Sequence, residues 1–395
     1  MRHSLARVLA LASLVPLAAT AQAAGPAPHA VAPVAHAATP ASHPPAADAH
    51  GKTARLAAPT APRAPAPAAV HAGLGSLTGK TTVDPTLQAK MLRLLDESRA
   101  PGGAIVVSDV RTGRVLAWAS RGPGDWVREA HTSSASVFKV VTTAALLDRH
   151  RVSLTTRQCY TDAEHGITEA DLDDSPRDLG CVPFSEALGL SINTVFARLT
   201  LKHLSPLELR ATAGALGFGA KVPADVDAAF GEATIPDDRL GLARASAGFW
   251  SATLSPLGAL FAMQTIANGG EKVKLFVHDS GAPVARVSVG RAMSPETARA
   301  MTQMLVVTTR RGTAAKAFRE ARGGARPVLP NVNVAGKTGT LVGGHPTRMV
   351  SWFAGFAPAE RPEIAVAVLL SNDVSWWSKG NVVARKVFEA YFAGR

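Results

Sequence analysis

The sequence predicts an α/β fold of the α+β type, in which one antiparallel sheet is assembled from both ends of the folded chain around an inserted helical subdomain. Three observations lead to this prediction. Strand-like segments occur at residues 103–119 and again at residues 333–370. The chain between them shows helical periodicity, and amphipathic helical patterns open and close the folded part.

The first 23 residues have the pattern of a secretory signal peptide. Basic residues precede an apolar run from Val8 to Ala19, and Ala21-Gln22-Ala23 has the small-residue pattern of a cleavage site. The run is shorter than the ~20 residues that a membrane-spanning helix needs. We therefore expect an exported protein, periplasmic or extracytoplasmic; the alternative is a tether to the cytoplasmic membrane through an uncleaved N-terminal segment.

Residues 24–73 are rich in Ala, Pro and His and contain few large apolar side chains, which predicts a disordered linker. Residues 74–395 are then a single domain, with its sheet region at about 74–130 and 310–395 and the helical insertion at about 131–309. The formal net charge of +12 is spread along the chain without a basic cluster, so we expect no nucleic-acid partner.

The elements of this domain can be placed in order. Thr86–Arg99 has apolar residues at helical spacing, and Gly103–Ser108 and Arg114–Ala119 flank the turn Arg111-Thr112-Gly113 as two adjacent antiparallel strands. Helical patterns, most of them opened by proline or serine, follow at Ser136–Arg149, Pro183–His203, Pro206–Leu216, Pro256–Asn268 and Pro295–Thr308. Strand patterns return at Asn333–Ala335, Val350–Phe356 and Ile364–Leu370, and a helix at Val382–Phe392 closes the chain.

The chain has two cysteines, Cys159 and Cys181. In an exported protein disulfides persist, so we expect these two residues to pair; a pair of free thiols is the alternative. Neither the cysteines nor the scattered histidines show the spacing of a metal site, and we expect no metal and no cofactor.

Ser136 and Lys139 are three residues apart at the start of a predicted helix, so their side chains lie on one face. Serine becomes a good nucleophile when a neighbour removes its proton, and a lysine can do so only when it is neutral. Burial or a second cation must then lower the pKa of Lys139, and Lys337 is a candidate for that cation. The pair alone is weak evidence, since about one such pair is expected by chance in a chain of this length.

Two further motifs strengthen this interpretation. Ser191-Ile192-Asn193 follows an apolar, proline-initiated helix start. Lys337-Thr338-Gly339-Thr340 lies inside the first C-terminal strand, where a lysine and two hydroxyl side chains interrupt the strand pattern and therefore suggest a function. A specified Lys-Thr-Gly triplet arises by chance in about one chain in twenty of this size. All three motifs in this order are therefore unlikely to be a coincidence.

With these motifs the sequence resembles the transpeptidase domain of penicillin-binding proteins, in the superfamily of serine D,D-peptidases and β-lactamases. The resemblance covers residues 74–395 and includes Asn193–Phe196 after the second motif and Trp352–Pro358 after the third. It implies a β-lactamase/transpeptidase-like fold, with a five-stranded antiparallel sheet, flanking helices and an inserted all-helical subdomain.

The resemblance also implies a role for each motif residue. Ser136 would attack the carbonyl of the penultimate D-Ala, with Lys139 as the base during acylation. Ser191 would relay a proton to the leaving amine, and Asn193 would hydrogen-bond the substrate amide and Lys139.

The third motif would bind the other end of the substrate. Lys337, Thr338 and Thr340 would hold the terminal carboxylate, and Gly339 would let the strand approach the substrate closely. The backbone N–H groups of Ser136 and Thr340 would form the oxyanion hole.

The function implied is a serine D,D-transpeptidase that cross-links peptidoglycan stem peptides and is covalently acylated by β-lactam antibiotics, with a separate glycosyltransferase as a candidate partner. A D,D-carboxypeptidase would share the acyl-enzyme and differ in its acceptor. A class D β-lactamase is disfavoured by Asn193, because its second motif usually ends in Val. A non-catalytic wall-binding or β-lactam-sensing module is disfavoured by the intact Ser136, Lys139 and Lys337.

Overall fold

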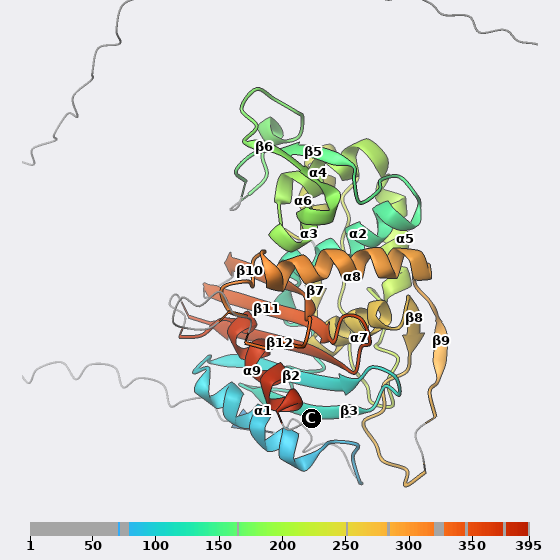
Figure 1. Cartoon of the computed structure of the whole chain (residues 1–395), viewed down its shortest axis with the longest axis vertical. Coiled ribbons are helices and arrows are strands. Elements are labelled where there is room, and N and C mark those ends of the chain that lie inside the picture. Colours follow the sequence, from blue (N-terminus) through green and yellow to red (C-terminus); the bar gives the residue numbers. More distant parts are fainter. Residues whose placement is uncertain are drawn as a thin grey trace, which may run out of the picture. The chain divides into compact units, whose positions relative to one another are not determined.

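The five predicted strands form one antiparallel sheet drawn from both ends of the folded chain (Figure 1). The structure, a computed structural model, describes residues 70–71, 79–163, 166–249, 252–282, 285–319, 328–343, 347–373 and 377–393. The predicted signal, residues 1–23, and the predicted linker up to residue 69 lie outside the described residues. No helix within the described ranges combines the length and apolar character of a bilayer-spanning segment.

The strand order is β1-β3-β2-β12-β11-β10, and every neighbouring pair is antiparallel. The predicted hairpin gives β2 and β3, and the C-terminal strand patterns give β10, β11 and β12. The strands are β2 (Gly102–Asp109), β3 (Val115–Arg121), β10 (Ala335–Gly343), β11 (Arg348–Ala357) and β12 (Ile364–Asn372). β10 is an edge strand of this sheet.

A sixth strand, β1 (Val70–His71), pairs with β3 at the opposite edge, inside the segment predicted to be linker. Its two residues carry no strand pattern of their own, so this pairing depends on the edge that β3 offers and not on local sequence.

The sheet is buried on both faces because successive side chains of a strand point to opposite sides. On β2, Ala104 and Val106 pack into one core, while Ile105 and Val107 pack into another. The first core contains α7 (Pro256–Ala267), and the second contains α1 (Pro85–Glu97) and α9 (Gly380–Phe392). Figure 1 shows α1 and α9 together on the same side of the sheet.

The insertion is mainly helical and packs beside β10, along which α8 (Pro295–Arg310) runs (Figure 1). Besides α7, its other α-helices are α2 (Lys139–Asp148), α3 (Phe184–Leu190), α4 (Asn193–His203), α5 (Pro206–Leu216) and α6 (Arg239–Ala247). Ser205, Ser255 and Ser294 cap α5, α7 and α8, each followed by proline at the first helical position, as the sequence predicted.

The sequence predicted an all-helical insertion, and this part of the prediction is wrong because the insertion also contains short strands. Short antiparallel pairs join β4 (Thr132–Ser133) to β7 (Thr253–Leu254), β5 (Arg157–Tyr160) to β6 (Gly180–Pro183), and β8 (Glu271–Val273) to β9 (Ser288–Arg291). The β5–β6 pair places Cys159 opposite Cys181, and the predicted disulfide between them is present.

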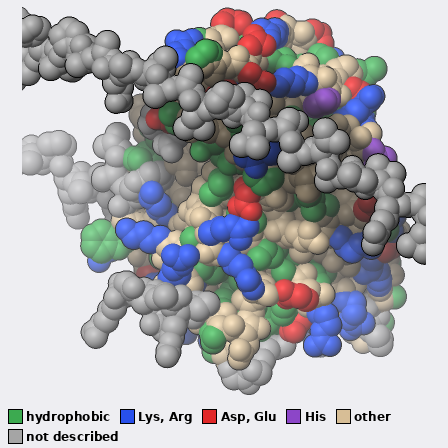
Figure 2. Space-filling view, turned by 45° about the horizontal axis from the view of Figure 1, so that its top comes forward, with side chains coloured by type: hydrophobic (Ala, Val, Ile, Leu, Met, Phe, Trp, Pro, Cys, Tyr) green, Lys and Arg blue, Asp and Glu red, His purple; other side chains and the backbone are tan. Residues whose placement is uncertain are grey.

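Charged side chains are dispersed over the face of the molecule shown in Figure 2. Lys and Arg side chains form several separate groups there, with acidic and uncharged side chains between them.

Candidate active site

Ser136 lies in a short 3₁₀ helix, Ala135–Phe138, which runs directly into α2. Its N–H group is in the first turn of that helix, where N–H groups have no intrahelical acceptor. Ala135 has a φ of 47°, and a Cβ atom added to Gly248 would lie 2.1 Å from the Ala135 carbonyl oxygen. Only glycine therefore lets the backbone after α6 approach the turn that carries the serine.

Lys139 is fully buried, and its amine has three acceptors. Its Nζ atom donates to Ser136 Oγ at 2.8 Å, to Asn193 Oδ1 at 2.7 Å and to the carbonyl oxygen of Ala247 at 2.6 Å. None of the three acceptors is a carboxylate, so nothing in this set neutralises a positive charge on the amine.

The pKa of Lys139 lies well below the ordinary lysine value, first because burial removes the charged form from water and second because Lys337 is close by. Burial also lowers the pKa of Lys337, to about 7. The site therefore holds a buried amine whose uncharged form is favoured relative to that of an ordinary lysine, in hydrogen-bond contact with a serine hydroxyl.

Ser191 and Asn193 lie where the chain passes from α3 to α4. The sequence predicted one helical segment over Pro183–His203, but Ser191 has a left-handed φ of 59° and ends α3, and Asn193 begins α4. The break turns both side chains toward the other motifs. Ser191 Oγ accepts from Lys337 Nζ at 2.8 Å, while Asn193 accepts from Lys139.

The third motif lies on β10, facing the 3₁₀ helix. Lys337 and Gly339 are buried, whereas Thr338 and Thr340 on the opposite side of the strand reach the open cleft. A Cβ atom at Gly339 would lie 3.3 Å from Ala135 Cβ, so glycine keeps the strand close to the serine turn. Trp352, opposite Gly339 on β11, donates from Nε1 to the Ser133 carbonyl at 2.9 Å and fixes this approach.

The three motifs share one cleft of about 630 Å³. Its lining includes Ser136, Ser191, Asn193, Thr338 and Thr340, while Lys139, Lys337 and Gly339 lie behind these side chains. All eight predicted site residues are thus brought together.

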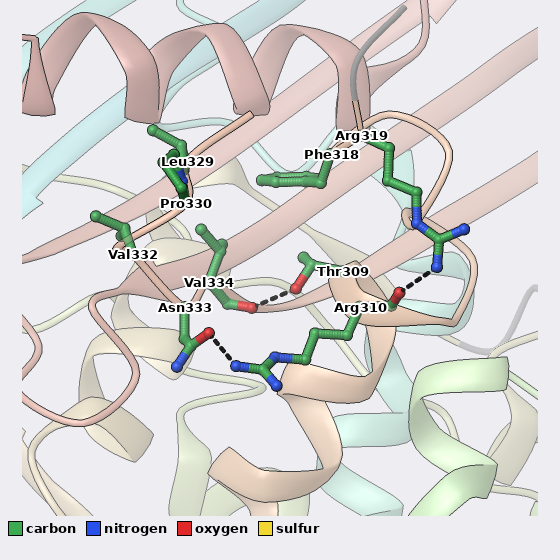
Figure 3. A pocket seen from close by; sticks show the side chains of 9 residues that line it. All are labelled: Thr309, Arg310, Phe318, Arg319, Leu329, Pro330, Val332, Asn333 and Val334. Atoms are coloured by element: carbon green, nitrogen blue, oxygen red, sulfur yellow. Dashed lines mark hydrogen bonds between the residues drawn. The ribbon is translucent and has the colours of Figure 1, made fainter. Parts of the chain in front are cut away.

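A second pocket, of about 310 Å³, lies between the end of α8 and the segment that leads into β10 (Figure 3). Arg310 there donates to Asn333 and Arg319 donates to the Arg310 carbonyl, and none of its lining residues belongs to the three motifs. The predicted site residues therefore belong to the larger cleft and not to this pocket.

Thr313 and Ala247 are among the residues that line the cleft and were not predicted from the sequence as site residues. Thr313 follows α8, and its Oγ1 atom lies 2.5 Å from Thr338 Oγ1, within hydrogen-bond distance. Ala247 contributes only its backbone carbonyl, which holds Lys139. A backbone acceptor leaves no trace in residue identity, and a lone threonine after a helix has no motif to mark it. Among the described residues there is no group of three or more His, Cys, Asp or Glu side chains that could hold a metal ion.

Comparisons with known proteins agree with this geometry. The family described as penicillin binding protein transpeptidase domain matches residues 103–393. The peptidoglycan D,D-transpeptidase PbpA of Mycobacterium tuberculosis is 31% identical over 281 residues, which are 66% of this chain and 55% of that protein. Stage V sporulation protein D of Bacillus subtilis is 27% identical over 351 residues, 78% of this chain and 52% of that protein. The chain thus spans about half the length of the curated relatives it matches.

Solved structures are similar across most of the chain. The crystal structure of PBPA from M. tuberculosis has a TM-score of 0.62 at 26% identity and covers 78% of this chain and 79% of that chain. Its ceftriaxone acyl-enzyme complex has a TM-score of 0.63 at 26% identity, covering 79% of each chain. The motifs, their shared cleft and the family match over most of the sequence lead to one conclusion: this chain belongs to the penicillin-binding protein transpeptidase domain family.

Proposed function

We propose that the chain is a serine D,D-transpeptidase that forms an acyl-enzyme with the D-Ala-D-Ala end of a peptidoglycan stem peptide. One observation carries this proposal: the buried amine of Lys139 contacts Ser136 Oγ at 2.8 Å, and its pKa is well below that of an ordinary lysine. The M. tuberculosis relative is named a peptidoglycan D,D-transpeptidase, and its PBPA structure has been solved as β-lactam acyl-enzymes.

In the acylation step, neutral Lys139 accepts the proton of Ser136 Oγ while the oxygen attacks the carbonyl carbon of the penultimate D-Ala. The oxyanion that forms is held by the N–H groups of Ser136 and Thr340. A hydrogen-bond donor of this kind is worth roughly 3 to 4 kcal/mol in the transition state. Collapse of the tetrahedral intermediate breaks the peptide bond and leaves the acyl group on Ser136.

The leaving D-Ala amine needs a proton, and Ser191 can relay one because its hydroxyl accepts a hydrogen bond from Lys337. Thr338 and Thr340 face the cleft beside that lysine and would bind the substrate's terminal carboxylate. An acceptor amine then attacks the acyl-enzyme by the reverse sequence of proton transfers. Water in place of the amine would give a carboxypeptidase product.

The experiment that tests this function supplies both acceptors. The purified chain is incubated with a disaccharide pentapeptide, with and without an added amine, and the products are identified by mass. A cross-linked product that requires the amine supports transpeptidation, and loss of the terminal D-Ala alone supports a carboxypeptidase. Penicillin that is hydrolysed rapidly instead of remaining bound would indicate a β-lactamase.

We also propose that the domain acts outside the cytoplasm, because residues 1–23 have the pattern of a secretory signal. Fractionation of cells that express the full chain, with N-terminal sequencing of the product, distinguishes a cleaved export signal from a retained anchor. A separate glycosyltransferase remains a candidate partner, and co-purification from membranes tests it.

A further inference from the structure

The segment closed by the disulfide lies against the helices that carry the second motif. Its described parts, residues 159–163 and 166–181, are here called the clamped segment, and they run from β5 to β6 next to α4 and α6 (Figure 1). None of its residues lines the cleft. It nevertheless contacts the residues that hold Lys139, by two routes.

The first route runs through Asn193. The Nδ2 atom of Asn193 donates to the carbonyl oxygen of Ala163 at 2.7 Å, and its Oδ1 atom accepts from Lys139 at 2.7 Å. An amide has one donor end and one acceptor end, and the Ala163 carbonyl can pair only with the donor end. The clamped segment therefore determines which end of the Asn193 amide faces Lys139.

The second route runs through α6. Ala163, Ile167 and Leu172 of the clamped segment form a small apolar cluster with Ala197, Ala243 and Ala247. Arg244 strengthens this packing by donating to the Ile167 carbonyl at 2.9 Å. Ala247 is the residue whose carbonyl oxygen accepts from Lys139. Two of the three acceptors around Lys139 thus depend on the clamped segment.

Arg198 holds the clamped segment in place. Its side chain is fully buried, although it lies on α4 and carries a positive charge. Its guanidinium donates to the carbonyl oxygens of Cys159 at 2.9 Å and Asp171 at 2.8 Å, and to both carboxylate oxygens of Asp178, at 2.9 and 3.0 Å. These acceptors come from the beginning, the middle and the end of the segment.

A buried guanidinium destabilises the fold unless its N–H groups have hydrogen-bond acceptors. Because the N–H groups of Arg198 point in fixed directions, they favour one arrangement of the carbonyl and carboxylate groups of the clamped segment. A lysine at this position would have a single ammonium group and could not reach three separated acceptors in the same geometry. Arg198 is five residues beyond Asn193 on the same helix, so the helix fixes the distance between clamp and catalytic amide.

We propose that Arg198 is a positioning residue of the Ser136 site: by clamping the disulfide-closed segment onto α4, it holds the Ala163 carbonyl where it orients Asn193 toward Lys139. This inference rests on the proposed function of Ser136 and adds a residue that touches neither substrate nor nucleophile.

The test is a double-mutant cycle on the rate constant of acylation by a fluorescent penicillin. Arg198→Lys is made in the wild-type chain and in an Asn193→Ala background. Arg210→Lys is the matched control, since Arg210 also bonds a carbonyl and a carboxylate in the insertion, those of Ile235 and Asp237, but does not contact the clamped segment.

Arg198→Lys is expected to slow acylation roughly 10- to 100-fold, the size of effect that a small displacement of a catalytic group produces. In the Asn193→Ala background Arg198→Lys is expected to slow acylation far less, because the amide through which Arg198 acts is already absent. The Arg210→Lys control is expected to acylate at the wild-type rate. A purely structural role for Arg198 would give equal effects in both backgrounds.

If Arg198→Lys does not fold, Asp178→Asn replaces it in the same cycle, since it keeps the side-chain volume and removes the charge of the carboxylate that accepts two hydrogen bonds from Arg198, while the contact of Arg198 with Asp174 Oδ1 at 3.2 Å remains. Wild-type acylation in the folded variant, or an equal loss in both backgrounds, overturns the positioning role while the proposed function stands. A wild-type chain that takes no label at all overturns the proposed function and, with it, this inference.

Discussion

The amine of Lys139 lies 2.8 Å from the hydroxyl of Ser136, and both belong to one turn at the start of α2. In the proposed mechanism Lys139 can accept the proton of Ser136 only while its amine is uncharged. Full burial of Lys139 and the proximity of Lys337 both favour that state.

Acylation should depend on the charge of Lys337. Because this residue lowers the pKa of Lys139, Lys337→Met is expected to raise that pKa and move the acidic limb of the acylation rate profile to higher pH. Methionine keeps most of the side-chain volume. The measurement is the rate constant at saturating β-lactam between about pH 5 and pH 9. If the acidic limb of the Lys337→Met profile lies at the wild-type pH, Lys337 does not lower the pKa of Lys139.

Stability should change with pH in a way that can be assigned to Lys337. Its pKa is about 7 in the folded chain, and about 10.4 is usual for lysine in an unfolded chain. Between these values the unfolded state binds more protons, so the contribution of Lys337 to stability rises with pH and is least favourable below about pH 7.

Lys337→Met removes that contribution. The melting temperature of the variant relative to wild type should therefore be highest below about pH 7 and should fall steadily as the pH approaches 10. Thermal melts of both proteins across this window check it. A difference that does not vary with pH would mean that folding does not lower the pKa of Lys337, and that the residue stays charged in the folded protein across this window.

Gly248 should tolerate no side chain. It has a φ of 88°, and an added Cβ atom would lie 2.1 Å from the Ala135 carbonyl oxygen. Gly248→Ala is expected to destabilise the fold by about 2 kcal/mol or more and to slow acylation by displacing the turn that holds Ser136.

Gly269→Ala is the matched control for Gly248. Gly269 also has a positive φ, of 66°, but no atom lies within 4 Å of the added Cβ position. Gly269→Ala should lose only the stability that a positive φ costs a residue with a side chain, and it should be acylated at the wild-type rate. Equal acylation rates for the two variants would show that the close approach of Gly248 to Ala135 has no part in catalysis.

The disulfide should stabilise the insertion. Cys159 and Cys181 are separated by 22 positions, and closing a loop of this size contributes about 3 kcal/mol in the chain-entropy model. In urea unfolding, the free energy of unfolding is expected to be lower for the reduced chain than for the oxidised chain by this amount. The Cys159→Ser, Cys181→Ser double variant should match the reduced chain and be insensitive to reductant. A reductant effect of equal size on the double variant would assign the change to something other than the bond.

The sheet and most helices could be predicted because local patterns coincide with the final structure. Short continuous runs of β-branched and other apolar residues mark β2 and β12, and Ser294 followed by Pro295 marks the start of α8. The five strands of the predicted sheet are confirmed, as is the pairing of Cys159 with Cys181.

What could not be predicted depends on contacts between distant parts of the chain. The left-handed conformation of Ser191 divides a continuous helical pattern into α3 and α4, and the presence of a serine does not predict this conformation. The helix α6 was not predicted, because its residues are mostly small and give little amphipathic signal, and the pairing of Val70–His71 exists only because β3 leaves an open edge.

The same division holds for the site. Side chains that we propose to act directly, such as Ser136 and Lys337, are marked by their spacing in motifs. The carbonyl groups of Ala163 and Ala247 are not, because any residue could supply them. Arg198 also escapes notice, since a lone arginine in a helix usually lies at the surface.

The most direct test of Ser136 as the nucleophile is covalent labelling of Ser136→Ala by fluorescent penicillin, compared with wild type and with the exposed-serine control Ser153→Ala. We expect a stable label on wild type and on Ser153→Ala and none on Ser136→Ala, whose melting temperature should stay within a few degrees of wild type because no large cavity is made. Persistent labelling of the folded Ser136→Ala protein would contradict the assignment of Ser136 as the nucleophile.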